Sequence, residues 1–133
     1  MLANILGPVL NQPLHFSVIG TFTGYFEQYI VFIIESMGLL DFDWDESKNS
    51  ANQRKHGVSF EEARTVFYDE NAREYHDPDH SGSEDRFIML GMSFMAKVLV
   101  ICHCYREKDS VIRIISARKA NKREQKSYRE VRS

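Results

Sequence analysis

The side chains with the clearest potential for chemistry are imidazole, ammonium, guanidinium and phenol groups that run from mid-chain to near the C-terminus. They are Lys55, His56, Arg86, His103, Arg113, Arg118 and Tyr128. Cationic groups stabilise negative charge that builds on phosphorus, and imidazole groups transfer protons. RNA cleavage needs little more, because a base activates the 2′-hydroxyl, cations stabilise the phosphorane and an acid protonates the leaving oxygen. The set therefore predicts metal-independent cleavage if the fold gathers these groups on one exposed surface of a sheet.

One candidate pair within this set is His103 with Arg113. The alternation of side chains along a strand places Ile101, His103 and Tyr105 on one face. Arg113 stands among apolar residues of the next predicted strand, where a guanidinium requires a partner or a charged ligand. We expect the two side chains to face one another if the strand register allows it. The alternative is a histidine satisfied within the core, which is the commoner situation for a lone strand histidine.

Lys55 and His56 lie in the last turn of a predicted helix over residues 45–56. Asp45 can accept a hydrogen bond from a free N–H of the first turn. Gly57 can adopt the left-handed conformation that ends a helix. Cations are favoured at that end by the helix dipole. The sequence therefore predicts a cationic corner suited to a polyanion, and the alternative is a plain helix C-cap.

Two segments raise the alternative of a metal site. The loop His76–Ser83 holds two histidines and two aspartates, which are zinc ligands, but its Asp-Pro-Asp sequence is also typical of a turn. The two cysteines, Cys102 and Cys104, are one pleat apart on the same side of a predicted strand, and this geometry disfavours a disulfide between them. We expect a turn at the loop, packed free thiols in a reducing cytoplasm, and no bound metal.

The net charge of −2 hides an uneven distribution along the chain. Residues 41–79 hold eleven carboxylates, whereas residues 111–133 hold eight cations and two carboxylates, a net charge of +6. A basic end on an otherwise acidic chain indicates a nucleic-acid contact or an acidic partner. The alternative is a solvated helix face with no partner.

The hydrophobic pattern predicts an α+β fold with two N-terminal helices, an antiparallel β-sheet meander and a C-terminal helix. The second helix begins at a capping box formed by Ser59 and Glu62, and Asn121 with Glu124 predicts a similar start for the last helix. The predicted strands cover residues 73–75, 86–92, 97–105 and 111–116, and the last helix covers residues 121–131. The nearly all-apolar stretch Val98–Cys102 predicts a central strand with both faces covered.

Residues 1–40 differ from the rest of the chain because they carry only two formal charges, Glu27 and Glu35. Polar residues interrupt the apolar stretch 14–34, whereas a membrane-spanning helix requires about 20 mostly apolar residues. No Lys or Arg precedes the apolar part, so a secretory signal peptide is a poor match. We expect an appended N-terminal extension, with Met37 as an alternative start, followed by a single domain over residues 41–133.

Several motifs follow one another from residue 42 to residue 128. They are Phe42-x-Trp44-Asp45-x-x-Lys48, Asn52-x-x-Lys55-His56-Gly57-Val58-Ser59-Phe60-Glu61-Glu62-Ala63, Asp77-Pro78-Asp79-His80-Ser81, Arg86-Phe87-Ile88 and Arg113-Ile114-Ile115-Ser116-Ala117-Arg118, with Glu124 and Tyr128. Together they resemble the BrnT family of type II toxins. The resemblance implies a RelE-like fold and a small cytoplasmic ribonuclease that blocks translation without a metal or other cofactor. It also implies RNA as substrate, a BrnA-like antitoxin as partner, and operator DNA contacted only through the antitoxin complex.

Within this resemblance, each candidate residue has an expected role. We expect Lys55 and His56 near the scissile phosphate, His103 as acid or base, and Arg118 as a catalytic phosphate clamp. Arg86, Arg113 and Tyr128 are the expected substrate-binding residues. The alternatives are a non-catalytic module that binds nucleic acid or antitoxin, and a degenerate, inactive toxin.

Overall fold

The structure is a computed structural model that describes residues 28–30, 32–33, 40–80, 82 and 84–132. The expected extension over residues 1–40, including Met37, lies almost entirely outside these residues. From residue 41 onward the chain forms an α+β fold, with the C-terminal helix that the sequence predicts. The elements are β1 (Asp41–Asp43), α3 (Glu46–His56), α4 (Phe60–Thr65), η2 (Val66–Tyr68), β2 (Arg73–His76), η3 (Pro78–His80), β3 (Phe87–Met92), β4 (Val98–Arg106), β5 (Val111–Lys119) and α5 (Lys122–Arg132). Within the described ranges, no helix has the length and apolar character needed to cross a membrane.

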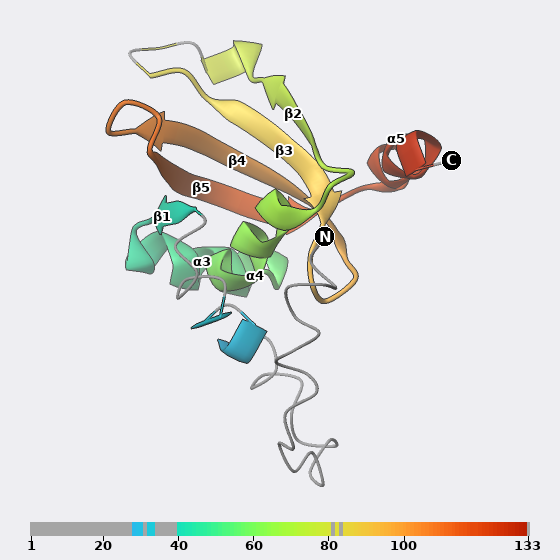
Figure 1. The fold of residues 1–133 in the computed structure, drawn as a ribbon, viewed down its shortest axis with the longest axis horizontal. Coiled ribbons are helices and arrows are strands. Elements are labelled where there is room, and N and C mark those ends of the chain that lie inside the picture. Colours follow the sequence, from blue (N-terminus) through green and yellow to red (C-terminus); the bar gives the residue numbers. More distant parts are fainter. Residues whose placement is uncertain (1–27, 31, 34–39, 81, 83, 133) are drawn as a thin grey trace, which may run out of the picture.

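The sheet contains five strands in the order β1-β5-β4-β3-β2, with β4 at its centre (Figure 1). The four strands from β2 to β5 are antiparallel neighbours, as the sequence predicts. The prediction of a purely antiparallel meander is wrong, because β1 pairs with β5 in parallel. This short strand brings the start of the domain beside its last strand.

One face of the sheet packs against α3, α4 and η2, and we call it the helix-covered face. Its core consists of buried apolar side chains from the helices and from the two central strands. The cluster is Val58, Phe60, Ala63, Val66, Leu99, Ile101, Ile114 and Ala117. Gly91 lies on this face, where an added Cβ would stand 2.7 Å from Val66 and 2.8 Å from Ala72. The absence of a side chain at Gly91 therefore lets η2 approach β3 closely.

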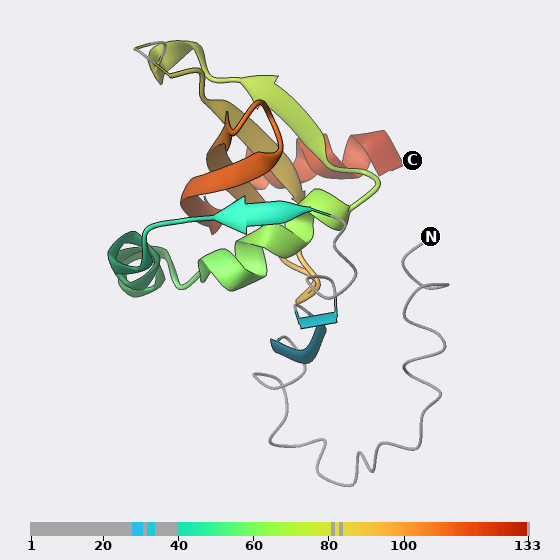
Figure 2. The same ribbon diagram turned by 60° about the vertical axis from the view of Figure 1, so that its left-hand side comes forward.

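The opposite face of the sheet is covered at one end by α5. Leu90 and Val100 of the sheet pack there with Ala120 and with Tyr128 of α5. Figure 2 shows α4 and α5 on opposite sides of the sheet. The remainder of this second face is free of helices in the described part of the chain, and this is where polar side chains of β5 emerge.

The caps of α3 are those expected from the sequence. Asp45 accepts hydrogen bonds from the backbone N–H groups of Ser47, at 2.8 Å, and Lys48, at 3.2 Å. Gly57 adopts the left-handed conformation with φ of 68° and ends the helix. The buried residues of α3 are Asn49 and Asn52, so the helix packs on the domain through amides rather than through an apolar stripe.

The capping boxes predicted at Ser59 and Asn121 differ in outcome. Ser59 accepts the N–H of Glu62 at 3.0 Å, but the Glu62 carboxylate accepts a hydrogen bond from Ser93 instead of reaching back. Asn121 and Glu124 exchange both bonds, at 2.8 and 2.9 Å. The reciprocal box fixes the first turn of α5 beside the end of β5.

Candidate functional site

Arg113 and Arg118 project from the same face of β5, opposite the helix-covered face. The register pairs Arg118 with Val100, and Arg113 with Cys104, and directly paired residues share a face. We call this surface the arginine face and define it by Arg113, Ser116 and Arg118 of β5 with Cys102 and Cys104 of β4. It belongs to the sheet surface that α5 covers at one end, and Cys104 within it is buried.

A β-bulge is what brings these two arginines together. Residues five apart in a regular strand point to opposite faces, because side chains alternate. In β5 the register shifts so that Ser116 pairs with Cys102 and Ile114 pairs with His103, which leaves Ile115 as the extra residue. The bulge therefore reverses the alternation between Arg113 and Arg118, and both guanidinium groups reach one surface.

Arg118 forms a bidentate ion pair with Glu124 of α5. Its Nη1 lies 2.8 Å from Glu124 Oε2 and its Nη2 lies 2.9 Å from Oε1. The paired carboxylate raises the pKa of Arg118, and the guanidinium holds the pKa of Glu124 below its ordinary value. The side chain of Arg118 is still 43% exposed, so the pair orients the guanidinium without removing it from solvent.

Two further arginines border the same surface. Arg113 forms an ion pair with Asp43 of β1 and is 31% exposed. Burial raises the pKa of the Cys102 thiol, and the charge of Arg86, which directly precedes β3, opposes this increase in part. The structure therefore places all three expected arginines on or beside the arginine face. No local pattern indicated Asp43 as a partner, because β1 was not predicted.

Lys55 and His56 lie at the end of α3, alongside the edge of β5. Asn52 donates to the carbonyl of Ala117 at 2.7 Å and accepts from the Ala117 N–H at 3.1 Å. His56 is one turn beyond Asn52 on the same face of the helix and is half-buried, whereas Lys55 is exposed. Because Ala117 directly precedes Arg118, the Asn52 contact places the end of α3 at the edge of β5, although α3 packs on the face of the sheet opposite to the Arg118 side chain.

His103 does not belong to this surface. Its register partner is Ile114, and Arg113 pairs with Cys104, so the expectation that His103 faces Arg113 is wrong. His103 is fully buried on the helix-covered face, with its ring 4.9 Å from that of Phe67. Burial lowers the pKa of the imidazole, against the opposing effect of Glu74, whose Oε1 lies 3.6 Å from Nε2. His103 is therefore not among the groups that the fold brings to the arginine face.

Tyr128 is also part of the core rather than of a surface. The side chain is 1% exposed, and its hydroxyl donates a hydrogen bond of 2.8 Å to Asp69. The same carboxylate oxygen accepts the N–H of Met92 at 2.7 Å. Tyr128 thus fastens α5 to the sheet, and its burial leaves no room for the expected contact with a substrate.

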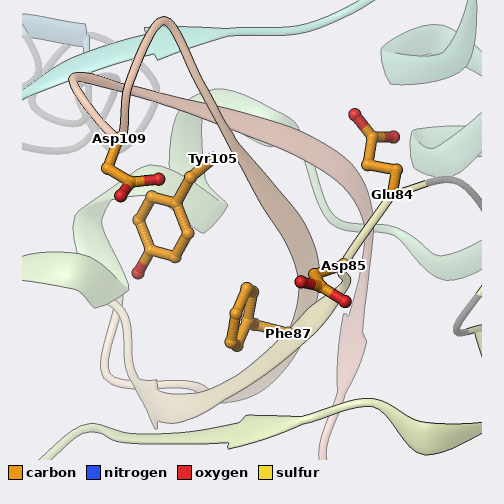
Figure 3. A pocket seen from close by; sticks show the side chains of 5 residues that line it. All are labelled: Glu84, Asp85, Phe87, Tyr105 and Asp109. Carbon is orange, nitrogen blue, oxygen red and sulfur yellow. The ribbon is translucent and has the colours of Figure 1, made fainter.

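An open pocket of about 640 Å³ lies at the other end of the sheet, away from α5 (Figure 3). Phe87 and Tyr105 form its floor, with ring centroids 5.4 Å apart. Its rim consists of the carboxylates of Glu84, Asp85 and Asp109. Carboxylates repel a phosphate backbone, so this pocket does not fit the polyanion for which the arginine face is suited.

The loop with two histidines and two aspartates adopts turn structure over its described residues. Pro78–His80 form a 3₁₀ turn, and Asp77 accepts the N–H of Asp79 at 3.2 Å. Among the described residues, no group of three or more His, Cys, Asp or Glu side chains is arranged to hold a metal ion. Cys102 and Cys104 are both free thiols.

Comparison with known proteins identifies one family. The family model for "Ribonuclease toxin, BrnT, of type II toxin-antitoxin system" matches residues 44–124. A solved structure, the crystal structure of the ribonuclease toxin BrnT from Brucella abortus, is 19% identical to this chain. The match covers 62% of this chain and 99% of that chain, with a TM-score of 0.48. No curated protein sequence matches the chain.

Proposed function

Because the chain belongs to the BrnT family of ribonuclease toxins of type II toxin–antitoxin systems, we propose that it cuts RNA at the arginine face and thereby inhibits translation. The observation that carries this proposal is the match over residues 44–124. This range contains Asn52, the cationic corner of α3, and the bulged strand with Arg113 and Arg118. The toxin domain in our proposal covers residues 41–133, and its fold is RelE-like.

The arginine face supplies the cations that the reaction requires. Arg113 and Arg118 lie on either side of the bulge, and both contact the scissile phosphate. Arg86 contacts the neighbouring phosphate. Guanidinium groups bind phosphate oxygens through paired N–H donors and stabilise the charge that develops on phosphorus. Both β5 arginines are partly exposed, so a phosphate can compete with their carboxylate partners from the solvent side.

The cationic corner supplies the proton transfers. His56 accepts the proton of the 2′-hydroxyl, and the 2′-oxygen then attacks phosphorus. The bond to the leaving 5′-oxygen breaks, and this oxygen takes a proton from the Lys55 ammonium group. The products are a 2′,3′-cyclic phosphate and a 5′-hydroxyl. His103 and Tyr128 take no part in this proposal, because both side chains are buried.

The remaining features follow from membership of a toxin–antitoxin family. We propose that the reaction is independent of metal and of other cofactors, since cationic side chains can supply the charge stabilisation. The partners are RNA and a BrnA-like antitoxin, and operator DNA is contacted through the antitoxin complex. The site of action is the cytoplasm, because the substrate RNA is found there. The two free thiols are compatible with the reducing conditions of that compartment.

A second candidate function rests on the ion pairs of the two β5 arginines. Asp43 and Glu124 already neutralise Arg113 and Arg118. If these pairs persist in the presence of RNA, the chain would bind an antitoxin or nucleic acid without cutting. This candidate includes the case of a degenerate, inactive toxin.

Incubation of the purified full chain with RNA tests the proposal. We expect cleavage that is suppressed by the cognate antitoxin and unchanged by a metal chelator. Cleaved strands should end in a cyclic phosphate. Intact RNA at every protein concentration would support the second candidate, and loss of cutting on addition of the chelator would contradict metal independence.

A further inference from the structure

The outward face of α5 is a row of cations. Lys122, Lys126 and Arg129 are exposed and recur at helical spacing on one side of the helix. Arg123, next to Lys122 in the first turn, extends the row and is exposed. We call these four residues the basic row.

Few carboxylates offset this charge. From residue 118 to residue 130 the chain holds six Lys or Arg and two Glu, a net charge of +4. One of these, Glu124, is engaged by Arg118. The other, Glu130, lies 3.8 Å from Lys126, and both of these side chains are mostly exposed. An exposed pair at this distance is weak and is screened by salt, so Lys126 remains available to another anion.

The opposite side of α5 is firmly attached to the domain. The guanidinium of Arg73 donates to the Ser127 carbonyl at 2.7 Å and to its hydroxyl at 2.8 Å. Gln125 donates to the carbonyl of Ala120 at 2.9 Å, and Tyr128 is buried. The basic row is therefore presented on a fixed element, so a ligand that binds it does not have to order the helix first.

The chemistry of the basic row favours a nucleic-acid backbone over a protein. Protein interfaces are centred on apolar and aromatic side chains, whereas the basic row offers only ammonium and guanidinium groups. Val131 is the large apolar side chain exposed on this helix, and it stands at the C-terminal end. Phosphates contact such cations without regard to base sequence.

The helix that carries the basic row also borders the proposed cleavage site. Arg118 of the arginine face bonds directly to Glu124 in the first turn of α5, so the same element joins the two surfaces. We propose that the basic row binds the single-stranded RNA backbone that flanks the cleaved bond. This inference rests on the proposed function for its substrate, but it concerns binding and makes no use of the cleavage step.

A matched pair of variants tests the basic row. The first is Lys122→Gln with Lys126→Gln, and the control is Lys48→Gln with Lys108→Gln, which removes two exposed lysines from α3 and from the β4–β5 turn. The probe is a single-stranded 2′-O-methyl oligonucleotide, which binds but cannot be cut through its 2′-oxygen. The measurement is the Kd of the full chain as a function of salt.

Loss of two phosphate contacts lowers the slope of log Kd against log salt by about 1.4. The ratio of Kd at about 200 mM salt to Kd at about 50 mM salt should be about sevenfold smaller for the α5 variant than for the parent. The control should show the same ratio as the parent. Lys122→Arg with Lys126→Arg should restore the parent slope. Equal slopes for the α5 variant and the parent would overturn the proposal.

Two further outcomes separate this inference from the proposed function. If the α5 variant loses RNA affinity but the parent never cuts RNA, the binding surface stands and the cleavage proposal fails. If the parent cuts RNA and the α5 variant binds the probe like the parent but loses affinity for the antitoxin, the row binds an acidic protein. That result would overturn the RNA assignment and leave the cleavage proposal intact.

Discussion

The two faces of the sheet treat their ionisable groups in opposite ways. On the helix-covered face, His103 is fully buried beside Phe67, and burial lowers its pKa. Its Nε2 has no hydrogen-bond partner among the described residues. On the arginine face, Arg113 and Arg118 are 31% and 43% exposed, and each is oriented by a carboxylate.

The difference shows that access, more than residue type, decides which groups can react. An imidazole is the more versatile catalyst, but His103 is enclosed, and burial lowers its pKa. A guanidinium that is half in solvent keeps its charge and can exchange one anion for another. His56, the histidine of the proposed reaction, differs from His103 because it lies at a helix end beside the β5 edge and is only half-buried.

The largest expected effect contrasts these two histidines. His56→Ala should lower the rate of RNA cleavage by about 10²–10⁴-fold, because a proton acceptor is lost. The His103→Phe variant should cut RNA at close to the parent rate, because the new phenyl ring fits among the aromatic neighbours of residue 103. His76→Ala, at an exposed histidine of β2, is the matched control. The contrast fails if a folded His103→Phe protein loses more activity than His56→Ala.

Asn52 joins α3 to β5 and so sets the position of the cationic corner. Asn52→Ala should lower the free energy of unfolding by about 2–4 kcal/mol, because the N–H and C=O of Ala117 and the C=O of Val58 lose their partner. Gln53→Ala, at the exposed neighbouring residue, should change it by less than about 0.5 kcal/mol. Urea denaturation of both variants measures the difference, and equal values would show that the Asn52 bonds do not hold α3 in place.

Burial of His103 makes stability depend on pH. The lowered pKa means that, below the ordinary value of 6.5, the unfolded chain binds a proton that the folded chain does not. The free energy of unfolding therefore falls as pH drops below about 6.5, by up to about 1.4 kcal/mol per pH unit. His103→Phe should remove this part of the dependence. A parent and a variant with the same profile from pH 7.5 to pH 5.5, taken by urea denaturation at about half-unit steps, would contradict the burial of His103.

The smallest expected effect concerns the exposed pair on the other face. Glu124→Gln should lower the free energy of unfolding by less than about 1 kcal/mol at neutral pH, because a partly exposed ion pair contributes little. The pKa of Glu124 is lowered in the folded state, so its contribution is complete above the ordinary value of 4.5 and is lost as pH falls through the folded value. Thermal unfolding at pH 7 and at acid pH measures both effects. A loss well above 1 kcal/mol would show that this pair is structural and not a replaceable holder of Arg118.

The local signals of the sequence predicted the ends of the helices. Asp45, Gly57 and the Asn121–Glu124 box act within one turn of the residues they cap, so spacing alone was sufficient. The identity of the central strand was also predictable, because Val98–Cys102 is apolar on both faces. These features depend on neighbours in the chain and not on the tertiary arrangement.

The arrangement of the site depended on contacts between distant residues. β1 is three residues long and pairs in parallel with residues about 70 positions away, so no local pattern marks it. The extra residue Ile115 reverses the alternation of β5, and a bulge of this kind has no signature in an apolar strand. Asn52 carried the one usable signal, since a polar residue on the inner face of a helix requires a partner.

The rate of RNA cleavage by Arg118 variants tests the central claim most directly. We predict that Arg118→Ala cuts RNA about 10²–10³-fold more slowly than the parent, that Arg118→Lys recovers part of the rate, and that Lys108→Ala cuts normally. All three proteins should unfold within about 1 kcal/mol of the parent. Cleavage by Arg118→Ala at the parent rate would contradict the placement of the scissile phosphate on the arginine face.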